Sequence, residues 1–319
     1  MKAIGIASTL AATSFATENL HIQYSKYLAQ HRKNYLTTEE YELRFINFAK
    51  THYAIEKHNA EGKSWTLAHN TFSDWTEAEK KALNGYIPTT RVFGEKSQKK
   101  FAGKNQDYTY LNSVKNVKNQ GSCGSCWAFS TTGSIESRSE LRNDSFTPLS
   151  EQQLIDCSKD NNGCSGGTYV TAFPYAAKYG LESEDDYPYQ MADGTCAYDA
   201  TKATHHDVYP EVPLFRVNPG DINAFLAELE RGPVSIAIEA DQDAFQLYKG
   251  GVLANDGSCG TQLDHAVLAV GNGNEGGLDY VLVKNSWGSN WGEGGFVKLG
   301  YSNGTAACGF LNDPAGVNV

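Results

Sequence analysis

The sequence predicts an α+β fold, because helical patterns fill its first half and strand patterns fill its second half. After Cys126 the chain runs to Thr132 without glycine or proline, which predicts a buried helix that continues through Leu141. Strand-like runs follow, and glycine-rich turns separate the last three of them: residues 234–238, 266–270, 280–284 and 296–299. Helices that precede strands, rather than alternate with them, indicate an α+β fold with two subdomains.

Capping signals and stop signals mark three further helices. Thr37 and Glu40 have the three-residue spacing of a capping box, and apolar residues at helical intervals follow them. Ser150 and Gln153 repeat this spacing ahead of another apolar run. A short helix is expected over residues 223–231, where a Gly-Pro pair then ends it.

The seven cysteines all lie at or after residue 123, so the first third of the chain differs in kind from the rest. An odd number of cysteines in a secreted chain suggests three disulfides and one remaining thiol. Residues 1–16 predict a signal peptide, because Lys2 precedes a mildly apolar stretch that ends in small residues at a suitable spacing. No apolar run reaches the length of about 18–20 residues that a membrane-spanning helix needs.

The charge of the chain also divides near residue 102. Residues 17–101 carry 13 Lys and Arg against 10 Asp and Glu, a net charge of +3. Residues 102–319 carry 13 against 27, a net charge of −14. The leading segment and the body should therefore attract each other. The acidic body argues against nucleic acid or an anionic membrane as a partner.

A reactive thiol is indicated by Cys126, in the stretch NQGSCGSCWAFS, where a helix is expected to begin. Unpaired N–H groups at a helix start favour the thiolate. A neighbouring imidazole would complete the activation and return a proton to a leaving amine. His265 in LDHAVLAV is the candidate, and Asn285 in VKNSWGSNW would orient its ring. Trp287 and Trp291 would cover that hydrogen bond.

Cys123 and Cys126 also form a Cys-x-x-Cys pair, which allows other interpretations. The two thiols could be a redox dithiol, half of a zinc site, or two cysteines with separate roles. A zinc site needs further Cys or His ligands at suitable spacing, and no second tight pair occurs in the sequence.

Three motifs together, QGSCGSCWAFS, DHAV and KNSWGxxWG, resemble those of the papain family of cysteine peptidases. This resemblance implies a papain-like fold with a mainly helical subdomain and a β-barrel-like subdomain. It implies Cys126 as nucleophile, His265 as acid–base, Asn285 as orienting residue and Gln120 as oxyanion donor. It implies no metal and no cofactor. The six other cysteines can pair in fifteen ways, and the resemblance selects Cys123–Cys164, Cys157–Cys196 and Cys259–Cys308.

The same resemblance implies the residues that bind substrate. Gly166 and Gly167 match a glycine strip that pairs with an extended peptide as an added strand would. Asp313 would form the floor of the pocket for the side chain two residues before the scissile bond, which predicts a dual preference for apolar residues and arginine. The alternative is that Asp313 turns outward. The remaining expected substrate-binding residues are Tyr169, Leu263, Asp264, Ala266 and Trp287.

The leading segment resembles cathepsin L-like inhibitory propeptides in two motifs. The first consists of residues on one helix face, and Thr51 replaces the usual Asn in it: Glu40, Arg44, Phe48, Thr51, Ile55 and Asn59. The second is Ala68-x-Asn70-x-Phe72-x-Asp74, with Ala68 in place of Gly. The implied domains are a signal peptide (1–16), an inhibitory propeptide (17–102) and a peptidase domain (103–319).

The expected protein is therefore a zymogen of a cysteine endopeptidase that acts through a thioester, in acidic, lysosomal-type protein degradation. The alternatives are a peptide ligase or transpeptidase using the same site, and a non-catalytic peptide-binding relative. Expected partners are polypeptide substrates, the chain's own propeptide and cystatin-like inhibitors, but no nucleic acid and no membrane. A monomer is expected, in the secretory pathway and then in a lysosome, a vacuole or the extracellular space. Asn143 and Asn303 begin glycosylation sequons.

Overall fold

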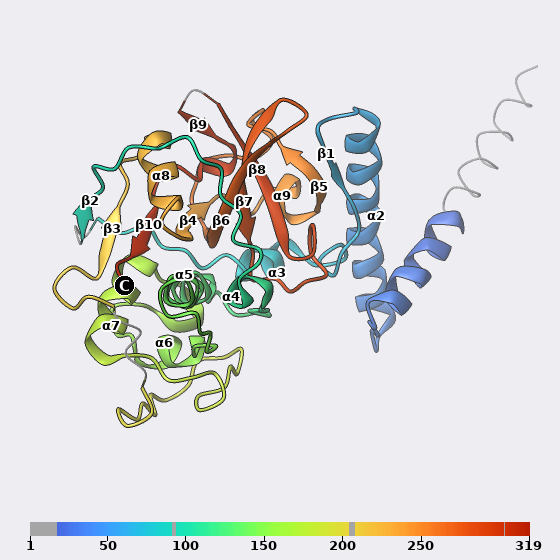
Figure 1. Ribbon diagram of the computed structural model, residues 1–319. Helices are drawn as coiled ribbons and strands as arrows, with labels where there is room; N and C mark the ends of the chain where they lie inside the picture. Colours follow the sequence, from blue (N-terminus) through green and yellow to red (C-terminus); the bar gives the residue numbers. More distant parts are fainter. Residues whose placement is uncertain (1–17, 91–93, 204–207, 303) are drawn as a thin grey trace, which may run out of the picture.

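The computed structural model describes residues 18–90, 94–203, 208–302 and 304–319. The expected signal peptide and the sequon residue Asn303 lie outside these residues. A group of helices around α5 (Cys126–Asn143) lies below a large sheet, and helix α2 (Thr38–Ala60) stands beside β1, at the right of the view (Figure 1). The architecture is the expected combination of helices and strands, with a helical leading segment.

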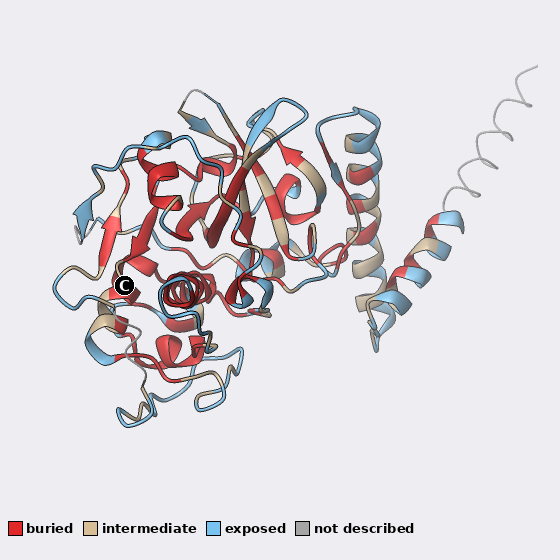
Figure 2. Ribbon diagram, viewed as in Figure 1, coloured by how far each residue is buried: buried red, intermediate tan, exposed pale blue. Residues whose placement is uncertain are grey.

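Helix α5 (Cys126–Asn143) is the centre of the helical part, and every residue from Cys126 to Glu140 is buried (Figure 2). Helix α6 (Glu151–Cys157) begins at the expected cap, where the Ser150 hydroxyl accepts a hydrogen bond from the Gln153 N–H at 3.0 Å. The other helical elements of this part are α4 (Asn112–Lys115), η1 (Gly163–Ser165) and α7 (Tyr169–Tyr179). No helix was predicted over the residues of α7, which contains Pro174 in its interior.

The sheet has the strand order β1-β5-β8-β7-β6-β4-β10-β3-β2, and β9 pairs with β8. Its four predicted strands are β4 (Val234–Ile238), β6 (His265–Glu275), β7 (Leu278–Lys284) and β8 (Phe296–Ser302). The body contributes four further strands, which were not predicted: β3 (Leu214–Arg216), β5 (Tyr248–Leu253), β9 (Thr305–Ala306) and β10 (Ala315–Val317). Helices α8 (Ile222–Leu229) and α9 (Asp243–Gln246) and the short η2 (Ala307–Gly309) lie between strands.

The leading segment extends this sheet at both ends. It contains a helix over residues 18–30, α2 (Thr38–Ala60), β1 (Trp65–Leu67), α3 (Glu77–Ala82) and β2 (Glu95–Lys96). Strand β1 pairs with β5 in antiparallel orientation, and β2 pairs with β3 in parallel orientation. The segment is thus built into the fold of the body at both places.

Both sequence motifs of the leading segment form its internal contacts. The Arg44 guanidinium binds the two carboxylate oxygens of Glu79 at 2.5 and 2.7 Å. Asp74 is fully buried and accepts hydrogen bonds from Tyr27 at 3.0 Å and Tyr35 at 2.6 Å. A buried carboxylate needs such donors, because leaving it unpaired would be costly. These contacts hold the helices of the leading segment against one another and against the loop that contains Asp74.

Two apolar cores meet in the body. One lies in the sheet and includes Trp287, and the other lies around α5 and includes Cys126. The leading segment adds five side chains to the first core: Ile55, Trp65, Leu67, Phe72 and Leu83. The boundary between the two cores is where the predicted catalytic residues lie.

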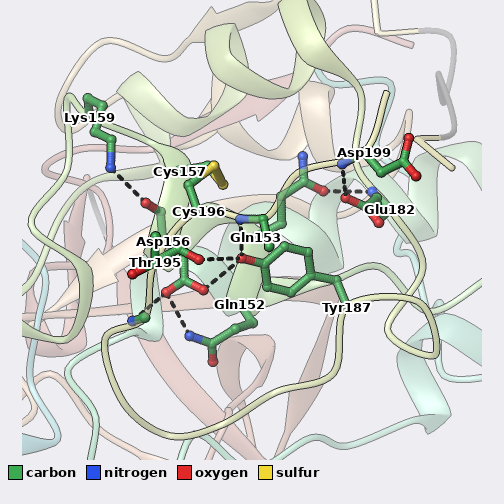
Figure 3. The surroundings of a disulfide bond; sticks show 12 residues. Gln152, Gln153, Asp156, Cys157, Lys159, Glu182, Tyr187, Thr195, Cys196 and Asp199 are labelled. Atoms are coloured by element: carbon green, nitrogen blue, oxygen red, sulfur yellow. Dashed lines mark hydrogen bonds between the residues drawn. A yellow bond between two sulfur atoms is a disulfide. The ribbon is translucent and has the colours of Figure 1, made fainter. Parts of the chain in front are cut away.

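The three disulfides join the pairs that the family resemblance implies: Cys123–Cys164, Cys157–Cys196 and Cys259–Cys308. Because Cys123 is bonded to Cys164, the redox-dithiol and zinc interpretations of Cys123 and Cys126 are wrong. Cys126 remains a buried free thiol. Around Cys157–Cys196, the carboxylate of Asp156 accepts hydrogen bonds from Gln152 at 2.9 Å and Tyr187 at 2.8 Å (Figure 3).

Neither a membrane span nor a metal cluster is evident in the part of the chain that the structure describes. There, no helix is both long and apolar enough to cross a bilayer. In the same residues, no three or more His, Cys, Asp and Glu side chains are grouped to hold a metal ion.

Candidate active site

The ends of three elements bring the predicted catalytic residues together. Cys126 is the first residue of α5, His265 is the first residue of β6, and Asn285 directly follows β7. Strands β6 and β7 are antiparallel neighbours, so the start of one and the end of the other lie at the same edge. The Cys126 thiol contacts the backbone of Ala266, the residue after His265. Residues that lie far apart in the sequence thus share one site.

His265 and Asn285 form a buried pair. The ring Nε2 of His265 lies 2.8 Å from Oδ1 of Asn285. Because that oxygen can only accept, Nε2 carries the proton in this contact. The other ring nitrogen, Nδ1, has no hydrogen-bond partner within the described part of the chain. The Trp287 ring lies 4.8 Å from the imidazole and covers the pair. A neutral imidazole held in this way presents Nδ1 as an acceptor.

Burial decides the charge state of the site in this form of the protein. It raises the pKa of the Cys126 thiol to about 11, although nearby backbone N–H groups oppose this shift. Burial also lowers the pKa of His265 to about 4, against the hydrogen bond to Asn285. Desolvation disfavours both charged forms. The helix start predicted a thiolate at Cys126, but here the neutral thiol and neutral imidazole are the stable pair.

Gln120 is fully buried and is held on both sides of its amide. Its Nε2 donates to the carbonyl of Leu83 at 2.8 Å and to that of Cys123 at 2.9 Å. Its Oε1 accepts from the Ser286 hydroxyl at 2.7 Å. One of the two donations therefore goes to the Leu83 carbonyl of the leading segment, and the other goes to the Cys123 carbonyl of the body. This is the arrangement required of an oxyanion donor.

The leading segment occupies the cleft with its backbone. Gly167 donates its N–H to the Gly85 carbonyl at 2.8 Å and accepts from the Ile87 N–H at 2.8 Å. A side chain at Gly166 would come within 2.8 Å of the Gly85 carbonyl, so the strip must be bare there. Gly85 itself lies so close to Gly124 that an added Cβ would clash with the Gly124 backbone at 1.8 Å. Only glycine allows this close passage over Cys126.

Asp264 anchors the same segment through its backbone and its side chain. The Asp264 carbonyl accepts the Tyr86 N–H at 2.7 Å, and Asn84 donates to its carboxylate at 2.9 Å. A third bond, from the Ala240 N–H at 2.8 Å, holds the other carboxylate oxygen. Burial raises the pKa of Asp264 to about 7.

The predicted substrate pocket holds the side chain of Tyr86. Its ring stacks on Tyr169 at 5.2 Å, and Ala266 and Leu263 belong to the same apolar cluster. The Tyr86 hydroxyl donates to Oδ2 of Asp313 at 2.5 Å. Asp313 is only 6% exposed, so the alternative in which it turns outward is wrong.

Three residues that the sequence reasoning missed support the site. Ser286 holds Gln120, and Asn161 packs beneath Gly167 and accepts the Thr168 N–H at 2.8 Å. Arg216 binds the carboxylate of Asp313. Ser286 could have been suspected from its place after Asn285 in the KNSW motif. Asn161 and Arg216 carry no motif, and only folding brings them to the site.

The comparisons with known proteins agree with this architecture. The family pattern described as papain family cysteine protease matches residues 103–317, and that of the cathepsin propeptide inhibitor domain (I29) matches residues 24–79. The chain is 40% identical to cysteine protease XCP2 of Arabidopsis thaliana over 88% of its own length and 81% of that protein. It is 39% identical to cathepsin L of Sarcophaga peregrina, over 87% of each chain.

Solved precursor structures have the same fold. The digestive procathepsin L2 proteinase of the Tenebrio molitor larval midgut superposes with a TM-score of 0.86 at 35% identity, covering 94% of this chain and all of that one. The recombinant stem bromelain precursor gives a TM-score of 0.81 at 30% identity, covering 94% of this chain and 99% of that one. The chain belongs to the papain family of cysteine proteases. It is a zymogen of that family, it carries its own I29-type inhibitory propeptide, and its relatives are cathepsin L-like.

Proposed function

We propose that this protein is a cysteine endopeptidase in which Cys126 is the nucleophile and His265 is the general acid and base. Asn285 orients the imidazole, and the Gln120 amide and the Cys126 N–H stabilise the oxyanion. The observation that carries this proposal is the contact of 2.8 Å between the Gln120 amide and the Leu83 carbonyl. A peptide carbonyl thus already lies at the donor where the reacting carbonyl of a substrate would lie.

The proposed reaction has two steps. The Cys126 proton passes to His265, and the thiolate attacks the peptide carbonyl, so that a C–S bond forms and the oxygen becomes an oxyanion. When the C–N bond breaks, His265 gives the proton to the leaving amine and a thioester remains. Water then adds to the thioester while His265 takes its proton. The C–S bond then breaks and His265 returns this proton to the sulfur, which releases the carboxylic acid and restores the thiol.

The leading segment would keep this machinery inactive in two ways. It fills the cleft with residues 83–87, and it buries Cys126 and His265 so that neither is charged. Its removal would return water to the site and allow the thiolate–imidazolium pair to form. Ion pairs between the segment and the body, such as Lys63–Asp256 at 3.0 Å, are partly exposed and contribute little individually. The opposite net charges of the leading segment and the body would therefore hold the two together through the sum of many such weak attractions.

Three disulfides favour folding in an oxidising compartment, which supports the secretory route to a lysosome, a vacuole or the extracellular space. There the enzyme would act on polypeptides, as a monomer, and cystatin-like inhibitors would bind the uncovered cleft. The domain boundaries at residues 16 and 102 and glycosylation at Asn143 belong to the same proposal.

The decisive experiment is active-site labelling. The zymogen is activated at acid pH and titrated with a peptidyl epoxide, and the modified residue is located by mass spectrometry. We expect stoichiometric labelling of Cys126 and loss of peptide hydrolysis, with no labelling of the Cys126→Ser variant. Labelling elsewhere, or hydrolysis that survives full labelling, would refute the assignment. Product analysis with an added amine nucleophile separates a hydrolase from a ligase, because both pass through the thioester.

A further inference from the structure

The side chain of Tyr86 fills a buried pocket beside the cleft. The residue is only 4% exposed, and its ring lies 5.2 Å from that of Tyr169 at an angle of 28°. Its hydroxyl donates to Oδ2 of Asp313 at 2.5 Å, and Thr168 lies at the longer distance of 3.5 Å. Burial, reinforced by the Asp313 carboxylate, raises the pKa of Tyr86, so its hydroxyl stays protonated and donates. The pocket is thus occupied by a phenol that satisfies a carboxylate.

The second oxygen of this carboxylate, Oδ1, is bound by the Arg216 guanidinium. The Asp313 side chain is 8% exposed and that of Arg216 is 24% exposed, so the pair is largely shielded from water. Arg216 ends strand β3, whose antiparallel partner β10 begins two residues after Asp313. Arg216 lies directly opposite Ala315, and the Val217 N–H donates to the Pro314 carbonyl at 3.0 Å. The strand pairing therefore holds Arg216 and Asp313 together.

This pair changes the chemistry that Asp313 offers to a ligand. The charge of the carboxylate is already matched by Arg216, so a guanidinium entering the pocket would meet a paired acid and a nearby cation. One carboxylate oxygen, Oδ2, still faces the pocket and needs a donor. A phenylalanine ring would fill the same space and leave that oxygen without a hydrogen bond, which is unfavourable in a buried site. A tyrosine supplies both the ring and the donor.

We propose that this pocket is selective for tyrosine, and that Arg216 determines this specificity by pairing with Asp313. Without Arg216, Asp313 would be an unmatched buried acid and would accept arginine, as the sequence alone suggests. Arg216 touches no substrate atom in this scheme and acts as a positioning residue through Asp313. The inference rests on the proposed function, because it assumes that the pocket receives a substrate side chain when the leading segment has been removed.

The test uses activated enzyme and three fluorogenic dipeptides that differ only in the residue entering the pocket: Tyr-Arg, Phe-Arg and Arg-Arg. For the wild type, we expect kcat/KM for Tyr-Arg to exceed that for Phe-Arg by roughly tenfold to a hundredfold, as for loss of a hydrogen bond to a charged group. Arg-Arg should be the poorest substrate. Asp313→Ala should bring the Tyr-Arg to Phe-Arg ratio close to one.

Arg216→Gln provides the readout that a purely structural role would not give. We expect it to raise kcat/KM for Arg-Arg by about tenfold, mainly through KM, and Arg216→Gln combined with Asp313→Ala should abolish this gain. Arg231→Gln is the matched control, because Arg231 also pairs with a buried carboxylate, that of Glu228 at 3.1 Å, while its own side chain is 52% exposed. It should leave all three substrates unchanged.

Equal cleavage of Tyr-Arg and Phe-Arg by the wild type, or no gain of Arg-Arg cleavage in Arg216→Gln, would overturn the proposal. If Arg216→Gln does not fold, Tyr86→Phe provides a second test, because it removes the hydroxyl that donates to Asp313 and leaves Arg216 in place. The zymogen carrying it should process itself about tenfold faster at a fixed pH, and an unchanged rate would overturn the proposal equally. Failure to cleave any peptide, together with no epoxide labelling of Cys126, would instead refute the proposed function.

Discussion

Acidification should loosen the leading segment through His69, a partly buried histidine of the segment. Its ring stacks on Phe48 at 4.3 Å, and its Nε2 lies 3.2 Å from Nδ1 of His52. The other ring nitrogen, Nδ1, is buried without a hydrogen-bond partner among the residues described. Burial, and then the charges of His52 and His31, lower the pKa of His69 to about 4. The folded segment therefore requires the neutral ring.

The size of the effect follows from this shift. The open segment binds a proton near pH 6.5, whereas the folded segment binds it only near pH 4. Stability contributed by the neutral ring is thus complete above pH 6.5 and is lost as the pH falls from 6.5 to 4. A shift of this size corresponds to about 3 kcal/mol at most, and partial exposure of the ring reduces the expected loss to about 1–2 kcal/mol. The open population should rise about 5- to 30-fold.

The measurement uses the Cys126→Ser precursor, which cannot process itself. Hydrogen exchange of helix α2, corrected for the intrinsic pH dependence, gives the opening free energy between pH 7.5 and 4. In the His69→Phe variant, the loss on acidification should be smaller by about 1–2 kcal/mol, because the stacked ring no longer titrates. His21→Phe is the control, since His21 also stacks on a phenylalanine, at 3.9 Å from Phe45, but is exposed.

The reasoning fails if His69→Phe opens with the same pH dependence as its parent. It also fails if His21→Phe reduces that dependence as much as His69→Phe does, because exposure would then not matter.

Three further outcomes are expected. Gln120→Ala should lower kcat about 100-fold or more with little change in KM, as loss of an oxyanion donor does, and steady-state kinetics on the activated enzyme would show it. Phe72→Ala removes the edge-to-face contact with Trp287 at 5.2 Å, and costs about 3 kcal/mol. The zymogen should then process itself on the order of 100-fold faster at pH 6, and an unchanged time course would contradict this contact's role. Replacing Cys157 and Cys196 by alanine opens a 39-residue loop and should destabilise the body by about 4 kcal/mol, measured by denaturant unfolding.

Several features could be predicted because their signals are local. Thr37 caps α2, accepting the Glu40 N–H at 3.2 Å, because capping depends on residues three apart. Strand β4 has the predicted bounds, Val234–Ile238, since a continuous apolar run between turn residues leaves few alternatives. Helix α7 was missed because Pro174 lies in its interior, where a proline cannot donate the backbone hydrogen bond of its turn and therefore indicates a helix end.

The sequence by itself determined the family, the fold class and the identity of the residues proposed for catalysis, because each lies in a short motif whose spacing can be read directly. Only the tertiary structure decided how those residues are tuned. The pKa values of Cys126 and His265 depend on their burial in the folded chain, which no local sequence pattern records. Likewise Arg216 meets Asp313 across 97 residues, through the pairing of β3 with β10. The charge state of a catalytic side chain and the specificity of a pocket depend on residues that are distant in the sequence, and only folding brings those residues together.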